Sequence, residues 1–154
     1  MHVVLVEPEI PPNTGNIART CAATGTSLHL IKPLGFSVSD RYLRRAGVDY
    51  WHLVDVHIHE SWDALPDNLR NPEHIHLFTS HARLSYTDTE YRPDDVLVFG
   101  RESVGLPQWI LSQFLDRQRK IPMAGAVRSL NLSNAAAIVV YEAMRQQGFP
   151  GLDA

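Results

Sequence analysis

Short, largely apolar runs of strand length recur along this chain, and each passes into a loop or a helix-length segment. Four of them occupy residues 3–6, 28–31, 75–79 and 96–99. Such runs, bounded by turn residues, are typical of strands that are buried on both faces of a parallel sheet. Because helical patterns alternate with these runs, we predict an α/β fold with a mostly parallel sheet flanked by helices.

Weaker patterns complete the expected order of elements. Residues 51–58 alternate enough for a third strand, and residues 120–123 would form the last one. Asn13 or Thr14 can cap the first helix, and Gly25 can end it. The sequence therefore predicts helices near residues 13–24, 40–46, 61–65, 107–114 and 131–147.

Length and composition predict an ordinary globular protein. The 154 residues fit one domain that spans 1–154. The single cysteine, Cys21, excludes an internal disulfide and lies in an apolar helical pattern, so we expect a core residue rather than a nucleophile. The apolar run at the N-terminus is too short for a signal peptide, and the longest run, 135–141, is far below the roughly 20 residues of a membrane span. We expect a cytoplasmic protein.

The net charge of −3 argues mildly against a surface that coats nucleic acid, because phosphate binding is driven by lysine and arginine. Local basic clusters can still bind RNA. On charge alone, a solvated helix face or loop is the simpler explanation of such clusters. They are Arg41, Arg44 and Arg45, and further along Arg117, Arg119 and Lys120.

Ligand sites on parallel sheets lie beyond the carboxyl ends of the strands, which singles out the loops after Val6, Phe99 and Met123. The first loop brings residues 13–16 to the start of a helix, where backbone N–H groups and the helix dipole favour an anion. An ordinary capped helix with a surface arginine, Arg19, is the alternative. It does not easily explain two asparagines, a glycine and an arginine in one turn region.

The second loop places Gly100 directly after a buried strand, where the missing side chain allows a close approach to the backbone. A plain glycine turn is the alternative. The loop is not a P-loop, because Gly105 is followed by Leu106 and Pro107.

The third loop gathers four polar side chains around the start of the last helix. Capping needs two of them, although capping alone remains an alternative. The four are Ser129, Asn131, Ser133 and Asn134.

Other chemistries find little support in the sequence. No GxGxxG fingerprint follows the first strand and no nucleophile elbow is present, which weakens oxidoreductase and hydrolase interpretations. Two pairs of histidines have strand spacing that puts each pair on one face, and with His81 they could suggest a metal. Without nearby cysteines we expect solvent-exposed histidines and no metal. The pairs are His57 with His59, and His74 with His76.

Taken in order, the segments at 8–25, 43–47, 97–107 and 121–146 resemble the SPOUT RNA methyltransferases, and most closely the branch of small tRNA (cytidine or uridine) 2′-O-methyltransferases. The resemblance covers essentially the whole chain. It implies a deep trefoil knot in the C-terminal part of the sheet, S-adenosylmethionine as cofactor, and a homodimer. It also implies methylation of the wobble nucleotide of a tRNA at the ribose 2′-oxygen. Arg101 and the pair 126–127 depart from the usual pattern, which puts substrate detail in doubt.

Carried over by this resemblance, Asn13 and Arg19 are the catalytic residues. A guanidinium stays protonated and is a poor base, so we expect Arg19 to position the target phosphate and to stabilise the developing alkoxide. The residues expected to contact RNA are Arg44, Arg45, Arg128 and Tyr141. The residues expected to contact the cofactor are Phe78, Gly100, Glu102, Gly105, Ile121, Met123, Ser129, Leu130 and Asn131.

Three other functions compete with this one. The same chemistry could act on another RNA site, although relatives with such targets usually carry an extra RNA-binding domain. A non-catalytic RNA-binding or assembly protein could have kept the fold. An unrelated nucleotide-binding oxidoreductase or hydrolase is disfavoured by the missing fingerprints.

Overall fold

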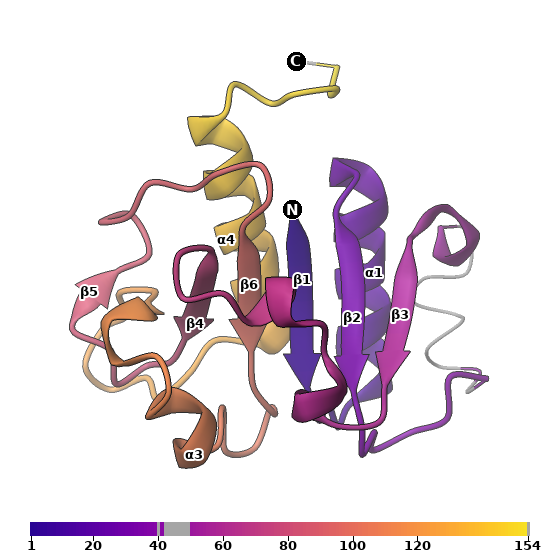
Figure 1. The fold of residues 1–154 in the computed structure, drawn as a ribbon, viewed down its shortest axis with the longest axis horizontal. Helices are drawn as coiled ribbons and strands as arrows, with labels where there is room; N and C mark the ends of the chain where they lie inside the picture. The colour runs from indigo at the N-terminus through magenta and orange to yellow at the C-terminus, as the bar shows by residue number, and fades with distance from the viewer. Residues whose placement is uncertain (40, 42–49, 154) are drawn as a thin grey trace.

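The computed structural model describes residues 1–39, 41 and 50–153. Within these residues, seven parallel strands form one sheet in the order β3-β2-β1-β6-β4-β7-β5 (Figure 1). The strands are β1 (His2–Val6), β2 (Ser27–Ile31), β3 (Val56–His59), β4 (Ile75–Phe78), β5 (Leu84–Ser85), β6 (Val96–Phe99) and β7 (Gln118–Lys120).

Helices cover the sheet on both faces. Two long helices, α1 (Pro11–Thr24) and α4 (Leu132–Gln146), pack against each other behind the strands in Figure 1. The opposite face is covered by shorter pieces. These are α3 (Gln108–Leu111) and the 3₁₀ turns η2 (Trp62–Ala64) and η3 (Asp67–Arg70). Two further 3₁₀ turns are η1 (Trp51–Leu53), which packs against α1, and η4 (Leu115–Arg117).

The central strands β1, β4 and β6 are largely apolar because both faces of the sheet are covered there. Val3 and Leu5 of β1 pack in the core beneath α1 and α4, whereas Val4 and Val6 pack beneath η2 and α3. Cys21 lies in the first of these cores, and burial raises the pKa of its thiol to about 12. Its prediction as a core residue is confirmed.

Strand β6 returns to the middle of the sheet, between β1 and β4. Its register aligns Leu5 with Phe99, so the two strands end side by side. Because all the strands are parallel, the loops that leave β1, β4, β6 and β7 start from one edge of the sheet. This order brings together loops that lie far apart in the chain.

The strongest strand predictions are confirmed, and two weaker ones are wrong. Residues 51–53 form a 3₁₀ turn, and β3 starts at Val56, because its pairing with β2 begins where Leu28 faces Val56. The last strand ends at Lys120 instead of starting there, because its partner β4 ends at Phe78. The sequence analysis missed the two-residue strand β5.

The helix ends are set partly by local signals. Gly25 adopts the left-handed conformation, with φ of 67°, and ends α1 as predicted. The expected cap at Asn13 or Thr14 is wrong, because Pro11 needs no N–H partner and lets the helix begin there. The oxygen of the Ser61 side chain accepts a hydrogen bond from Ala64 N at 3.2 Å and caps η2.

Two expectations remain open. The helix predicted at 40–46 falls largely outside the described residues, and the trefoil knot stays a prediction. No helix among the described residues is both long and apolar enough to cross a membrane.

Candidate active site

A cavity of about 680 Å³ opens at the carboxyl ends of β4, β6 and β7. The residues predicted for the cofactor line it, with the exception of Asn131. They come from three separate segments that the sheet order brings together. The predicted residues in the wall are Phe78, Gly100, Glu102, Gly105, Ile121, Met123, Ser129 and Leu130.

Two aromatic rings form the apolar floor of this cavity. Phe78 ends β4 and Phe99 ends β6, and because these strands are neighbours their rings stack with centroids 4.9 Å apart and planes 14° apart. Both residues line the cavity. Together with the side chains of Ile121 and Met123, they suit a flat, largely apolar ligand group.

Gly100 allows a close backbone approach, as predicted, but the group that approaches belongs to this chain. A Cβ at this position would lie 2.1 Å from the carbonyl carbon of Gly105 and from the nitrogen of Leu106. The turn is closed by Gly105 N, which donates to Arg101 O at 2.9 Å, and Gly105 adopts a φ of +71°. The second loop therefore folds back on its own first residue.

Glu102 links the second loop to the first. Its carboxylate accepts hydrogen bonds from the backbone N–H groups of Ile10 at 2.6 Å and Glu9 at 2.9 Å, and from Asn13 Nδ2 at 3.3 Å. Helix α1 has no side-chain cap of its own at Ile10. The negative carboxylate of Glu102 supplies partners at this helix start, where charge and unpaired N–H groups favour it.

A second carboxylate joins the same two loops, but here the acceptor lies on the first loop and the donors on the second. Glu9 accepts hydrogen bonds from the Ser103 hydroxyl at 2.6 Å and from the Ser103 backbone N–H at 3.0 Å. These bonds lower the pKa of Glu9. An ion pair between Arg101 and Glu7, with nitrogen and oxygen 3.1 Å apart, adds a third link. These contacts between the loops after β1 and β6, called the Glu102 clamp below, were not predicted, because nothing local connects residues more than 90 positions apart.

Asn13 extends the connection to the third loop. Its Oδ1 accepts from Asn131 Nδ2 at 3.0 Å, while its own Nδ2 donates to Glu102. Asn131 Oδ1 in turn accepts from the backbone N–H groups of Ser133 and Asn134, which confirms the predicted cap of α4. The Glu102–Asn13–Asn131 chain thus joins all three loops, and both halves of the Asn13 amide are engaged.

A second cleft, of about 360 Å³, lies between α1 and α4. It is lined by Arg19 and Asn16 from α1 and by Ser133, Asn134 and Tyr141 from α4, among others. The structure thus brings Arg19, predicted to be catalytic, together with Tyr141, predicted to contact RNA; both roles stay predictions.

The first turns of α4 separate this cleft from the cavity whose wall holds the residues predicted for the cofactor, named the cofactor cavity below for that prediction. Leu132 and Ala135 line the cavity, whereas Ser133 and Asn134 line the cleft. The two hollows therefore lie on adjacent sides of the start of one helix.

The predicted basic residues fall into different settings. Arg128 is exposed and lines the cofactor cavity, whereas Arg44 and Arg45 lie outside the described residues. The second basic cluster is not a solvated patch. Arg119 is buried and donates to backbone carbonyls of its own segment, and Arg117 donates to Ile75 O at 2.9 Å. Arg117 thus links the start of β7 to β4, whereas Arg119 is satisfied within its own segment.

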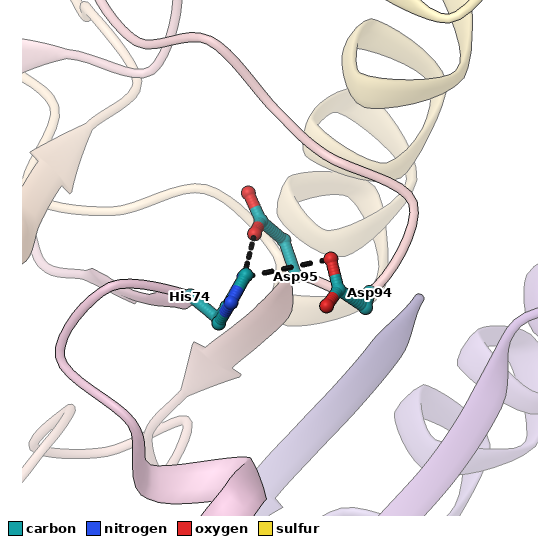
Figure 2. Close-up of side chains that lie close together, drawn as sticks. All are labelled: His74, Asp94 and Asp95. Carbon is teal, nitrogen blue, oxygen red and sulfur yellow. Dashed lines mark hydrogen bonds and ion pairs between the residues drawn. The ribbon is translucent and has the colours of Figure 1, made fainter.

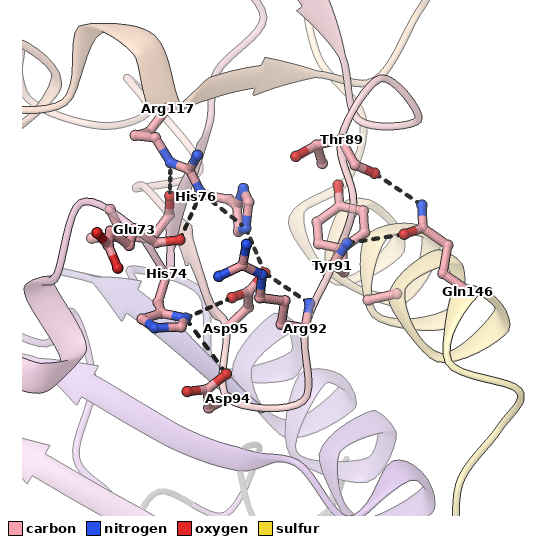
Figure 3. A network of polar contacts seen from close by, with 12 residues as sticks. Glu73, His74, His76, Thr89, Tyr91, Arg92, Asp94, Asp95, Arg117 and Gln146 are labelled. Carbon is pink, nitrogen blue, oxygen red and sulfur yellow. Dashed lines mark hydrogen bonds and ion pairs between the residues drawn. The ribbon is translucent and has the colours of Figure 1, made fainter.

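The prediction of solvent-exposed histidines is wrong for His76. It is buried on β4, and its Nε2 lies 2.7 Å from Asp95, which precedes β6 (Figure 3). Burial lowers the pKa of His76. Burial alone would raise the pKa of Asp95, but hydrogen bonds from His76 and from the Arg92 backbone outweigh it and lower that pKa. The pair thus holds a neutral imidazole against a carboxylate.

One group of side chains near this pair has ligand atoms close enough to hold a cation. His74 Nδ1 lies 3.2 Å from Asp95 and 3.5 Å from Asp94 (Figure 2). The Asp95 oxygens already accept hydrogen bonds from His76 and from Arg92 N. The group lies at the amino end of β6, at the opposite edge of the sheet from the cofactor cavity. We assign it a structural role.

The family model described as the SpoU rRNA Methylase family matches residues 1–141. The chain belongs to this family.

Individual relatives are similar over nearly their full length. A relative from Geobacillus stearothermophilus is 52% identical over 154 residues, which cover 99% of this chain and 98% of the relative. A tRNA (cytidine(34)-2′-O)-methyltransferase of Yersinia pestis is 47% identical, with 98% of this chain and 96% of that enzyme covered.

Solved structures agree with this membership. One structure, described as giving insight into 2′-OH methylation of C/U34 on tRNA, is 47% identical with a TM-score of 0.89, over 96% of this chain and 95% of that one. The SpoU methyltransferase AviRb from Streptomyces viridochromogenes, solved with AdoMet, is 25% identical with a TM-score of 0.85. That match covers 96% of this chain and 57% of AviRb.

Proposed function

We propose that this protein transfers a methyl group from S-adenosylmethionine to the ribose 2′-oxygen of the wobble nucleotide, cytidine or uridine 34, of a tRNA. The observation that carries the proposal is the placement of the two hollows. The cavity and the Arg19 cleft lie on adjacent sides of the first turns of α4. The full-length similarity to wobble-position methyltransferases gives the acceptor.

The cavity fits the proposed cofactor in size and in the chemistry of its wall. Phe78, Ile121 and Met123 offer an apolar surface to an adenine ring, while the backbone around Gly100 and Ile121 offers hydrogen-bonding groups. The bound cofactor would supply an electrophilic methyl group on a sulfonium. Glu102 would act by fixing the loop that forms the wall, because its carboxylate accepts hydrogen bonds from Glu9, Ile10 and Asn13.

Most of the catalysis would come from positioning and from a fixed electric field. Methyl transfer to a hydroxyl is an in-line displacement, and negative charge develops on the ribose oxygen as its proton leaves. Arg19 stands in the cleft as a permanent cation and can hold the target phosphate and stabilise that oxygen. Asn13, held between Glu102 and Asn131, would keep the helix that carries Arg19 in register with the cofactor wall.

RNA contacts would come from Arg128 at the cavity and from Tyr141 in the cleft, with Arg44 and Arg45 contributing from their segment. A tyrosine and arginines suit a single-stranded anticodon loop, whose bases can stack and whose phosphates are exposed. We further propose a cytoplasmic homodimer that needs no metal.

The test is transfer of labelled methyl from S-adenosylmethionine to tRNA that lacks wobble 2′-O-methylation, followed by nucleoside mapping. We expect label on the wobble ribose, and a loss of about 100-fold or more with Arg19→Ala, the scale of removing one charge-stabilising group. Arg92→Ala, which removes an exposed arginine at the opposite edge of the sheet, is the control.

The other outcomes separate the alternatives. Near-full activity of Arg19→Lys would exclude a specific guanidinium role. Label at another nucleotide would keep the chemistry and move the target. Cofactor binding by calorimetry without any methyl transfer would favour the non-catalytic RNA-binding alternative.

A further inference from the structure

Arg19 is held by an aromatic ring. Its guanidinium carbon lies 4.8 Å from the centroid of the Tyr50 ring, within the range of a cation–π contact. Arg19 is exposed on α1, and Tyr50 is half-buried directly before η1. Tyr50 lies outside the three loops that were singled out from the sequence, so this contact was not predicted.

The ring itself stands on an anchored piece of backbone. Leu53 N donates to Tyr50 O at 2.8 Å, which fixes the tyrosine to the 3₁₀ turn η1. That turn packs against α1, and Trp51 and Val54 pack against the core beneath α1 and α4. The backbone that carries the ring is therefore fixed relative to the helix that carries Arg19.

A cation–π contact leaves the N–H donors of the Arg19 guanidinium available for a ligand. An ion pair uses the N–H donors of an arginine, as in Arg101 with Glu7 and Arg145 with Glu142. A ring contacts the flat face and leaves the donors at the rim free. In the part of the chain that the structure describes, no hydrogen bond or ion pair engages the Arg19 side chain, which lines the α1–α4 cleft.

We propose that Tyr50 is a positioning residue that holds the Arg19 guanidinium so that its donors serve the α1–α4 cleft. The proposal rests on the proposed function. A free arginine side chain samples many rotamers, and ordering it on binding costs conformational entropy. The Tyr50 ring orders the Arg19 side chain before the RNA binds, which lowers this entropy cost. Because the contact is made by the face of the ring, the role does not depend on the hydroxyl.

The two substitutions Tyr50→Phe and Tyr50→Leu separate the ring from the hydroxyl. We expect Tyr50→Phe to keep kcat within about twofold. Tyr50→Leu should lower kcat by about two- to thirtyfold, the range between exposed and desolvated cation–π contacts. Cofactor affinity by calorimetry should stay unchanged in both variants, because Tyr50 is not among the residues that line the cofactor cavity.

A double-mutant cycle tests whether Tyr50 acts through Arg19. Under single-turnover conditions, Tyr50→Leu should cost little further activity in the Arg19→Ala background. A merely structural role for Tyr50 would lower activity equally in both backgrounds. The Nε–H resonance of Arg19, which the tyrosine ring current shifts, should move in Tyr50→Leu and stay close to its place in Tyr50→Phe.

The outcomes distinguish this proposal from the proposed function. An active wild-type protein whose Tyr50→Leu variant is equally active would overturn the role of Tyr50 alone. So would an equal loss in both backgrounds, or a Tyr50→Phe variant as impaired as Tyr50→Leu. A wild-type protein that transfers no methyl group to tRNA would overturn the proposed function, and this role with it.

Discussion

The carboxylate of Glu102 lies 2.6 Å from the backbone nitrogen of Ile10, although 92 positions separate the two residues. Through this contact a side chain from the loop after β6 completes the start of α1. The helix that carries Arg19 is thereby tied to the loop that walls the cofactor cavity. A substitution in the loop after β6 should therefore affect the start of α1, and a substitution there should affect the loop.

Replacement of Glu102 by glutamine should therefore weaken both stability and cofactor binding. A carboxamide has one oxygen to offer where the carboxylate uses two, and its NH₂ group would face a backbone N–H donor. We expect the free energy of unfolding to fall by about 1–2 kcal/mol, and cofactor affinity to fall as well. Urea unfolding and calorimetry measure the two. Glu90→Gln, at an exposed glutamate, is the control, and equal behaviour of the two variants would contradict the clamp.

Gly100 should not tolerate even a methyl group. A Cβ there would overlap the Gly105 carbonyl carbon and the Leu106 nitrogen, both backbone atoms, at 2.1 Å. We expect Gly100→Ala to lose about 1–3 kcal/mol of stability, as overpacking does, and most of its cofactor binding. Gly125→Ala is the matched control in the third loop, since a Cβ there meets nothing within 4 Å. Thermal unfolding with and without S-adenosylmethionine would decide, and tight cofactor binding by Gly100→Ala would contradict this account.

Stability should fall in acid through a histidine cluster on β1, β2 and β3. His29 is buried between His2 and His59, with nitrogen–nitrogen distances of 3.1 and 3.0 Å, and stacks on His57. Burial, then repulsion from these histidines, lowers the pKa of His29 to about 3, and the nearby Asp55 opposes this only in part.

The sign follows from which state binds the proton. The unfolded chain takes up a proton near the ordinary value of 6.5, whereas folded His29 resists until about 3. Stability is therefore complete above that ordinary value and is lost as the pH falls through this window. Allowing for solvent screening, we expect a loss of about 1 kcal/mol between pH 7 and pH 5.

Urea unfolding across this pH range tests the assignment. His29→Gln should flatten the pH dependence, because glutamine does not titrate. His52→Gln, which removes an exposed histidine of η1, should leave the slope as it is in the wild type. A slope that survives in His29→Gln would show that the acid sensitivity arises elsewhere.

Features that depend only on neighbours in the chain could be predicted from the sequence. The apolar runs at 3–6 and 96–99 became strands because a buried parallel strand needs no alternation. Gly25 ended α1 and Asn131 capped α4, because both signals act within a single turn. Strand reasoning singled out the loops after Val6, Phe99 and Met123, whereas the individual residues of the cofactor cavity were predicted only by family resemblance.

The tertiary structure alone decided which of these local pieces meet. Nothing in residues 51–58 indicated that pairing with β2 would start only at Val56, because that register depends on a strand elsewhere in the chain. The same holds for the Glu102 clamp, the stacking of Arg19 on Tyr50 and the burial of His29. Each depends on β6 or β3 taking its place in the sheet, and contacts between residues distant in sequence are fixed only by how the whole chain packs.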